Sequence, residues 1–371
     1  MNFDFSDEQI QLRDALQRWV DKGYTVERYR SIAKDGGFSR EAWNELAELG
    51  LCGLTVPEHL GGLGMGAVES MLVMEQLGAG LVLEPMTQCL INSAILIQFA
   101  SATMQAQWLP RIATGEVLVT LAQHERSARY QLDICEAKVT PTLTGYALTA
   151  IKNIVMAGGH ADAFVVSAQQ DEKLALFLVE RSAPGVSVRS YRTQDGSCAA
   201  DVSFNNTDAH LITHEGLNAL ELGVDIGIAC ACAQGVGVMD KTLAITADYL
   251  NTRKQFGVAI SSFQALRHRV ADMKMQLELA RSMSYYASLK LNTPSPERRA
   301  ALSRAKVQLG QSMRYVGQQA VQLHGGIGVT DEYIVSHYFK KLTQLEISFG
   351  DTLHHLGEVS ARMQNTAGVF A

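Results

Sequence analysis

The stretch NTRKQFGVAISSFQALRHRVADM, Asn251–Met273, joins a short polar segment to an amphipathic helix and decides the fold. Apolar residues recur at helical spacing in it and just beyond it, at Phe263, Leu266, Val270, Met273 and Leu277. They form one stripe, which predicts a helix with a buried apolar face. Directly before that helix lie Arg253, Gln255, Phe256 and Gly257. Taken alone, these residues also fit a solvated arginine ahead of an ordinary core helix.

The helical period continues toward the C-terminus and is interrupted at NTPSPERR, Asn292–Arg299, which we expect to be a loop between long helices. Further on, the segment QLHGGIGVTDEY contains Gln322, Gly325 and Gly326. Adjacent glycines between helical segments can simply end a helix. The C-terminal part of the chain, from residue 225, is therefore predicted to be helical.

Toward the N-terminus the pattern changes to short β-rich runs separated by turn residues, namely VLVTLA, YALTAI, AFVVSA, LALFLV and DVSF. These runs predict an antiparallel barrel or sandwich over residues 117–224. Before them, Ser6 and Gln9 have the form of a capping box, so a first helix is expected to begin near Asp7. The order α, β, α divides the chain into domains at 1–116, 117–224 and 225–371.

Gly62, Gly64 and Ala67 satisfy the G-x-G-x-x-A form of a dinucleotide-binding fingerprint. That fingerprint needs a preceding strand and a βαβ unit, whereas Pro57 interrupts any strand here and a helical region follows. We therefore interpret PEHLGGLGMG as a loop and expect no nicotinamide site in it.

Composition excludes several classes of protein. The 371 residues are 47% hydrophobic and 19% charged, as in ordinary globular proteins. A formal net charge of −6 and the lack of a Lys/Arg-rich run argue against nucleic-acid binding. The N-terminus does not have the pattern of a secretion signal, and we expect no membrane span and a cytoplasmic location.

Metal binding is not expected either. The six cysteines have no CxxC spacing, so buried reduced thiols are the favoured interpretation. His324, His354 and His355 have no carboxylate-spaced partners of the H-E-x-x-H type, which favours a structural or surface role for them.

The pattern R-x-x-F-G followed by F-Q-x-x-x-H-x-x-A-D-M, within residues 253–273, resembles the signature of acyl-CoA dehydrogenases. In that family the arginine and its neighbours reach the FAD of an adjoining subunit. Gln322, Gly325 and Gly326 resemble the family's Q-x-x-G-G-x-G element, whose backbone and glutamine contact FAD. A guanidinium suits a pyrophosphate because its fork pairs two oxygens, and a glycine lets the backbone come close.

The resemblance implies an α+β fold with an N-terminal helical domain, a middle antiparallel β-barrel and a C-terminal four-helix bundle. It implies FAD as cofactor and an acyl-CoA thioester as substrate, with electrons passed to an electron-transfer flavoprotein. A carboxylate removes the α-proton while the β-hydride goes to the flavin N5. Arg253, Gln255, Phe256, Gln322, Gly325 and Gly326 are the implied cofactor-binding residues.

The sequence departs from the family where the catalytic base is expected. The two usual glutamate positions fall on Phe349 and Gly227, and neither residue can accept a proton. Asp351 is the nearby carboxylate; it either replaces the base or is a solvated turn residue.

The barrel departs as well. The flavin-contacting stretch reads QHERSARYQ with only Glu125 kept, and the next flavin turn has Ile154 and Met156 at its Trp and Thr positions.

These departures resemble the divergent subunits of heteromeric acyl-CoA dehydrogenases, such as the small subunit of pimeloyl-CoA dehydrogenase. Two hypotheses follow. The chain desaturates an acyl-CoA as a subunit of a homo- or heterotetramer, or it is a structural partner that completes the FAD site of a homologous catalytic chain. The colour and flavin stoichiometry of the protein purified alone would distinguish them.

Overall fold

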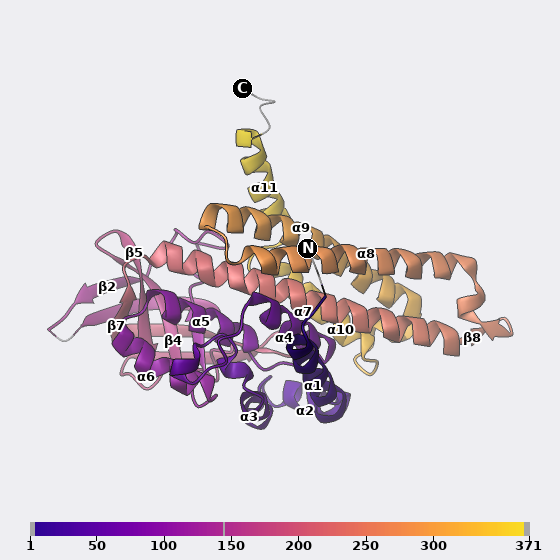
Figure 1. Cartoon of the computed structure of the whole chain (residues 1–371), viewed down its shortest axis with the longest axis horizontal. Helices are drawn as coiled ribbons and strands as arrows, with labels where there is room; N and C mark the ends of the chain where they lie inside the picture. Colours follow the sequence, from indigo (N-terminus) through magenta and orange to yellow (C-terminus); the bar gives the residue numbers. More distant parts are fainter. Residues whose placement is uncertain (1–3, 144, 367–371) are drawn as a thin grey trace. The chain divides into compact units, whose positions relative to one another are not determined.

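The computed structural model describes residues 4–143 and 145–366. The chain divides into two compact units. Figure 1 labels their helices and strands. Unit 1 comprises residues 1–29, 67–82 and 228–371, and unit 2 comprises residues 30–66 and 83–227. The long helix α7, Gly216–Thr252, begins in unit 2 and continues into unit 1.

Unit 2 contains the β-sheet and several helices. The helices are α3 (Arg40–Glu48), the short η1 (Leu51–Gly53) and η2 (Glu58–Leu60), α5 (Met86–Phe99) and α6 (Ala102–Ala113). The strands are β1 (Val119–Ala122), β2 (Lys138–Pro141), β3 (Tyr146–Met156), β4 (Ala163–Gln170), β5 (Lys173–Glu180), β6 (Val186–Arg192) and β7 (Cys198–Thr213). Helix α2, Val26–Lys34, crosses the boundary between the units.

Five strands follow one another in the order β4-β2-β3-β7-β5. Because β5 at one end of this order also pairs with β4 at the other end, the sheet closes into a barrel. Most pairings are antiparallel, as predicted, but β1 and β2 run parallel to β4. Four of the five β-rich runs lie wholly in strands, and the first, VLVTLA, overlaps β1 from Val119 onward. The core is filled by inward-facing apolar side chains, including Phe164 and Phe204 in an edge-to-face pair at 5.8 Å.

Two strands of the seven-stranded sheet, β2 and β6, were not predicted, and both have a physical reason. β2 is only four residues long, and three of them are exposed. Among the described strands β6 pairs with β7 alone, and its burial pattern has no fully buried position, so its apolar signal is weak.

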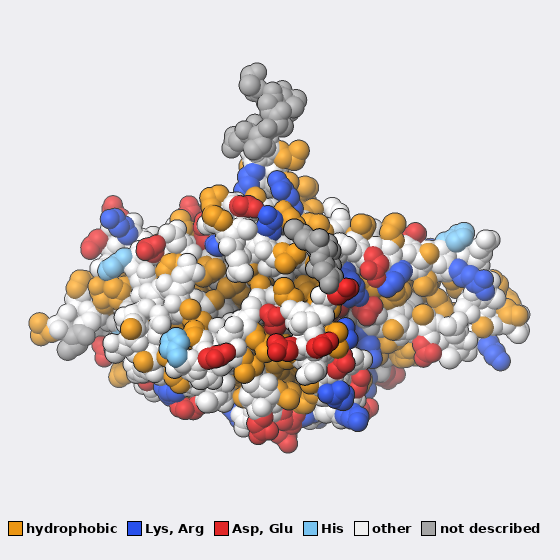
Figure 2. Space-filling model, viewed as in Figure 1, with side chains coloured by type: hydrophobic (Ala, Val, Ile, Leu, Met, Phe, Trp, Pro, Cys, Tyr) orange, Lys and Arg blue, Asp and Glu red, His pale blue; other side chains and the backbone are white. Residues whose placement is uncertain are grey.

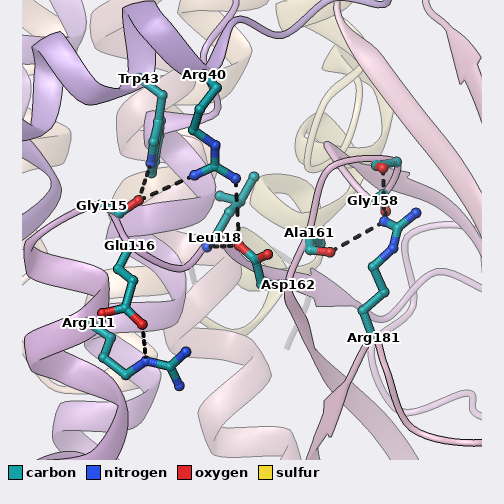
Figure 3. A network of polar contacts seen from close by, with 11 residues as sticks. Arg40, Trp43, Arg111, Gly115, Glu116, Leu118, Gly158, Ala161, Asp162 and Arg181 are labelled. Atoms are coloured by element: carbon teal, nitrogen blue, oxygen red, sulfur yellow. Dashed lines mark hydrogen bonds and ion pairs between the residues drawn. The ribbon is translucent and has the colours of Figure 1, made fainter.

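Polar contacts join the helices of unit 2 to the barrel (Figure 3). Trp43 of α3 donates its indole N–H to the Gly115 carbonyl at 2.9 Å. Arg40 lies 3.8 Å from the carboxylate of Asp162, which also accepts the Leu118 backbone N–H at 2.7 Å. These bonds hold residues 115–118, directly before β1, against α3 and against Asp162, which directly precedes β4.

Unit 1 is helical. It contains α1 (Asp7–Gly23), α4 (Ala67–Ala79), the rest of α7, α8 (Gln264–Lys290), α9 (Ser295–His324), η4 (Gly325–Val329), α10 (Val335–Ile347) and α11 (Thr352–Thr366). Helix α9 packs against α8, α10 and α11. The predicted capping box of α1 is present, with Ser6 and Gln9 bonded reciprocally. Helices α4 and α7 approach closely, since a Cβ on Gly237 would lie 1.8 Å from the Glu75 carbonyl oxygen.

Two helix starts differ from the sequence-based expectation. Helix α7 begins at Gly216 rather than near residue 225, because GLNALELGVDIG already carries the helical period. Helix α9 begins at Ser295, inside the expected loop, since a proline is tolerated in the first turn of a helix. The proposed three-domain division stays a prediction.

One helix is long and apolar enough to bear on the expectation that the chain has no membrane span. Helix α7 contains an 18-residue window with a mean hydropathy of 1.6, long and apolar enough by composition to cross a membrane. In the described part of the chain, 94% of that window is buried inside the protein, as is usual for the core helix of a globular protein.

Candidate cofactor and substrate site

The predicted Arg253 segment forms a small hairpin at the end of α7. Strand β8, Lys254–Gln255, pairs with β9, Val258–Ala259, across a two-residue turn. Both turn residues have positive φ, +54° for Phe256 and +81° for Gly257, as a tight hairpin turn requires. The hairpin is anchored at its base, where the Arg253 carbonyl accepts the Ile260 N–H at 2.9 Å.

The side chains of this hairpin face outward. Arg253 and Gln255 are exposed, and Phe256 is 90% exposed. A non-glycine residue in the left-handed region costs roughly 1–2 kcal/mol. Phe256 bears that cost while contacting Phe263 edge-to-face at 6.1 Å. An exposed aromatic side chain on a strained but anchored turn suits contact with a ligand or another chain.

The predicted glycine element lies at the end of α9. Gln322 is exposed on its last turn, and Gly325 and Gly326 begin η4. Gly325 has φ +67° and ψ −143°, a backbone conformation that L side chains rarely adopt. Gly326 has no such need, and a Cβ added there would meet nothing within 4 Å. Its surroundings therefore leave room for something outside this chain to approach the backbone.

The structure brings the two predicted elements together within unit 1. Tyr249, one helical turn before Arg253, stacks on His324 with ring centroids 4.4 Å apart. Tyr249 also donates its hydroxyl to the His324 carbonyl at 3.3 Å, next to Gly325. His324 is buried, and burial lowers its pKa, so the ring is held neutral in a structural role. A guanidinium, an exposed amide and an open glycine backbone thus lie at adjoining helix ends.

These residues fit the pyrophosphate-bearing part of FAD. The guanidinium and the amide supply donors to anionic oxygens, and the open backbone at Gly326 is a place that a Cβ would fill. In the described parts of the chain no group of three or more His, Cys, Asp or Glu residues could hold a metal ion. The guanidinium and amide donors suit an anionic ligand such as a phosphate.

The base positions carry no carboxylate. Phe349 is half-buried with φ +56°, and Gly227 is buried in the unit 2 part of α7. Asp351 is the N-cap of α11, because its Oδ1 accepts the His354 N–H at 2.8 Å. Asp351 therefore caps a helix at this turn, and its role as a base stays a prediction.

Sequence reasoning missed the buried ion pair of Glu125, which lies in the divergent barrel loop QHERSARYQ, residues 123–131. Lys152 is fully buried and donates to Glu125 at 2.6 Å and to the Ser167 hydroxyl at 3.0 Å. The same carboxylate accepts the backbone N–H groups of Glu136 and Ala137. Burial raises the pKa of Glu125, but bonds from Lys152 and Glu136 outweigh it and bring the pKa below its usual value.

The adjoining turn is also strained and clamped. Ile154 and Ala157 have φ of +52° and +57°, and Ile154 is 54% exposed. A β-branched residue in the left-handed region is a genuine outlier. Arg181 donates to the carbonyls of Gly158 and Ala161 at 3.1 and 3.3 Å, which fixes the turn (Figure 3). In the sequence, the retained Glu125 was the signal for the ion pair with Lys152, and the bonds of Arg181 had none.

Comparison with known proteins agrees with this architecture. Residues 6–116 match the model of the acyl-CoA dehydrogenase N-terminal domain, and residues 214–364 match that of the C-terminal domain. Acyl-CoA dehydrogenase FadE27 of Mycobacterium tuberculosis is 27% identical over 378 residues, covering 99% of this chain and 100% of that protein.

Two similar solved structures are each named for two proteins. A chain of the ChsE4–ChsE5 complex from Mycobacterium tuberculosis has a TM-score of 0.89 and 26% identity, and the match covers 99% of this chain and 100% of that chain. A chain of the Tcur3481–Tcur3483 steroid ACAD variant has the same TM-score and identity, with 97% and 99% covered. The chain belongs to the acyl-CoA dehydrogenase family, the FAD-dependent oxidoreductases that act on acyl-CoA thioesters.

Proposed function

We propose that this chain binds FAD and takes part in α,β-dehydrogenation of an acyl-CoA, within an oligomer containing a homologous chain. Electrons then leave to an electron-transfer flavoprotein. The observation that carries the proposal is the open glycine backbone at Gly326, beside exposed Gln322 and near the hairpin of Arg253. Among the residues that the structure describes, none lies close enough to demand a glycine at that position, whereas a ligand lying against the backbone would.

Each residue of the element has a role toward the cofactor. Arg253 would pair with the pyrophosphate oxygens, Gln322 would donate its amide, and Phe256 would offer an aromatic face. When bound, the flavin supplies the acceptor for the substrate's β-hydride. In the barrel, Glu125 joins the divergent stretch to Lys152 and to the backbone N–H of Ala137.

Asp351 remains our candidate for the group that accepts the α-proton, since Phe349 and Gly227 lack a carboxylate. Its capping bond to His354 would have to be given up or shared during proton transfer. That requirement favours the second candidate function, a partner subunit that completes the FAD site of a homologous catalytic chain. The two-chain complexes among the similar structures support the same candidate.

The test of FAD binding uses Gly326→Ala, measured by flavin content and by the dissociation constant for added FAD. The fold accommodates a Cβ at this position, so we expect unchanged thermal stability and at least tenfold weaker FAD binding. Gly357→Ala is the control, because Gly357 lies in α11 with equally open space. Arg253→Ala should weaken FAD binding by about 1.5–3 kcal/mol, the worth of a charge-assisted contact. Unchanged FAD binding in both site variants would refute the assignment.

The two candidate functions are separated by the protein purified alone and with its homologous partner. One flavin per chain, reduced by acyl-CoA without oxygen, indicates a catalytic subunit. In that case Asp351→Asn should abolish flavin reduction while FAD and acyl-CoA still bind. A colourless chain that binds flavin only with its partner indicates the structural role.

A further inference from the structure

The turn between α10 and α11 holds two successive residues in left-handed backbone conformations. Phe349 has φ +56° and Gly350 has φ +105°. An aromatic residue rarely adopts such a conformation, so the surrounding structure must hold it there. At Gly350 a Cβ would lie 2.6 Å from ring atoms of both His354 and His355, so only glycine fits.

Lys306 of α9 holds this turn from beneath. Its side chain is fully buried, and its Nζ donates to the carbonyls of Glu346 at 2.6 Å and Gly350 at 2.8 Å. His355 adds a third bond at 2.9 Å to the Phe349 carbonyl, which requires the proton on its Nε2. Two buried side chains therefore fix three carbonyls of one short segment.

These contacts of Lys306 go to the backbone rather than to the nearby carboxylate. Glu346 Oε1 is occupied by Arg314 at 3.1 Å and by the Thr352 hydroxyl at 2.6 Å. The ammonium lies at the C-terminal end of α10, where the last carbonyls carry partial negative charge. Burial of an ammonium is costly, so its retention for main-chain bonds points to a need for a fixed turn.

We propose that Lys306 is a positioning residue for the acyl end of the site, acting through the carbonyls of Glu346 and Gly350 on Phe349 and Asp351. The inference rests on the proposed function and on the family resemblance, in which position 349 is one of the two usual positions of the catalytic base. If the bonds of Lys306 to these carbonyls are lost, Phe349 and Asp351 change their positions relative to the thioester. Acyl-CoA affinity then falls, while FAD, which is bound by other residues, is retained.

The ionisation of Lys306 provides a readout that a general structural role would not give. Burial lowers its pKa to about 8, although Cys232, Glu346 and Asp351 face it and favour the charged form. Among the other groups near it, burial raises the pKa of Cys232 to about 12 and lowers that of His355 to about 3. Loss of the proton removes the charge assistance from both carbonyl bonds, so acyl-CoA affinity should decline through about pH 8.

The experiment compares the wild type, Lys306→Met and Arg281→Met as FAD-loaded full-length proteins. Arg281→Met is the control because it breaks the ion pair of Arg281 with Glu75, away from the turn but in the same unit. Octanoyl-CoA binding is measured by equilibrium dialysis from pH 6.5 to 9.5, FAD binding by fluorescence, and stability by thermal unfolding. We expect Lys306→Met to weaken octanoyl-CoA binding at least fivefold, to change FAD binding less than twofold and to abolish the decline near pH 8.

The outcomes separate this inference from the proposed function. If the wild type binds neither FAD nor octanoyl-CoA, alone or with its partner chain, the proposed function fails and this inference with it. If both bind but Lys306→Met behaves as Arg281→Met does, Lys306 is merely structural and the inference alone is wrong. Should Lys306→Met not fold, a wild-type octanoyl-CoA affinity that does not change between pH 7 and 9 overturns it.

Discussion

Replacing Lys152 with methionine should reveal how strongly the divergent barrel loop depends on its buried ion pair. The side chain is fully buried, and its ammonium lies 2.6 Å from the buried Glu125 carboxylate. Removing one partner of such a pair leaves an uncompensated buried charge, which costs about 3–5 kcal/mol. Glu125 keeps its backbone donors from Glu136 and Ala137, so we expect a loss of about 3 kcal/mol, at the lower end of that range.

Tryptophan fluorescence during denaturant unfolding measures this loss. Trp43 and Trp108 are buried in unit 2, whereas Trp19 lies in unit 1. A Trp19→Phe background therefore makes the signal report on the unit that contains the ion pair. The matched control is Arg189→Met, which breaks the ion pair with Asp201 in the same barrel; Arg189 is 78% exposed. Exposed pairs contribute about 0–1 kcal/mol, so the control should change little.

A double variant completes the test. Lys152→Met with Glu125→Gln removes both charges, and the glutamine can still accept a backbone N–H. We expect the double variant to be more stable than Lys152→Met alone, because no unpaired charge remains buried. If Lys152→Met costs less than about 1 kcal/mol, or if the double variant is the less stable of the two, the reasoning about charge burial is wrong.

Three further outcomes are expected. The pKa of Glu125 is held below its usual 4.5, so its contribution to stability is full above pH 4.5 and is lost as the pH falls through the lowered pKa. When unfolding is measured from pH 7 to 3, the free energy of unfolding should therefore decrease less steeply in Glu125→Gln than in the wild type. Phe256→Asn should raise stability by about 1 kcal/mol, since asparagine tolerates a left-handed turn, while FAD affinity decreases; a less stable variant with unchanged FAD affinity would contradict this. Leu353 and Leu356 are 75% and 47% exposed on α11, where Figure 2 shows hydrophobic side chains beside charged ones. Replacing both leucines with aspartate should therefore shift the sedimentation profile toward smaller species. An unchanged profile would place the subunit contacts elsewhere.

The sequence alone determined the features that depend on neighbouring residues. The capping box at Ser6 places the start of α1, and alternating or continuous apolar runs place five of the strands. The order of Arg253, Phe256 and Gly257 before the apolar stripe, followed by Gly325 and Gly326, was sufficient to indicate the family. All of these signals are local in the chain, so composition, spacing and the periods of helix and strand carry them.

Only the tertiary structure decided which distant groups hold the site. Nothing near Lys152 in sequence predicts its pairing with Glu125, and nothing near Lys306 predicts its bonds to the carbonyls of Glu346 and Gly350. The strain at Phe349 and the capping role of Asp351 are likewise set by the packing of α9, α10 and α11. Such bonds arise when chain folding closes long loops, and their buried polar groups must then find partners wherever the packing brings them. For that reason spacing could locate the candidate residues, while the groups that hold them in place had to be found in three dimensions.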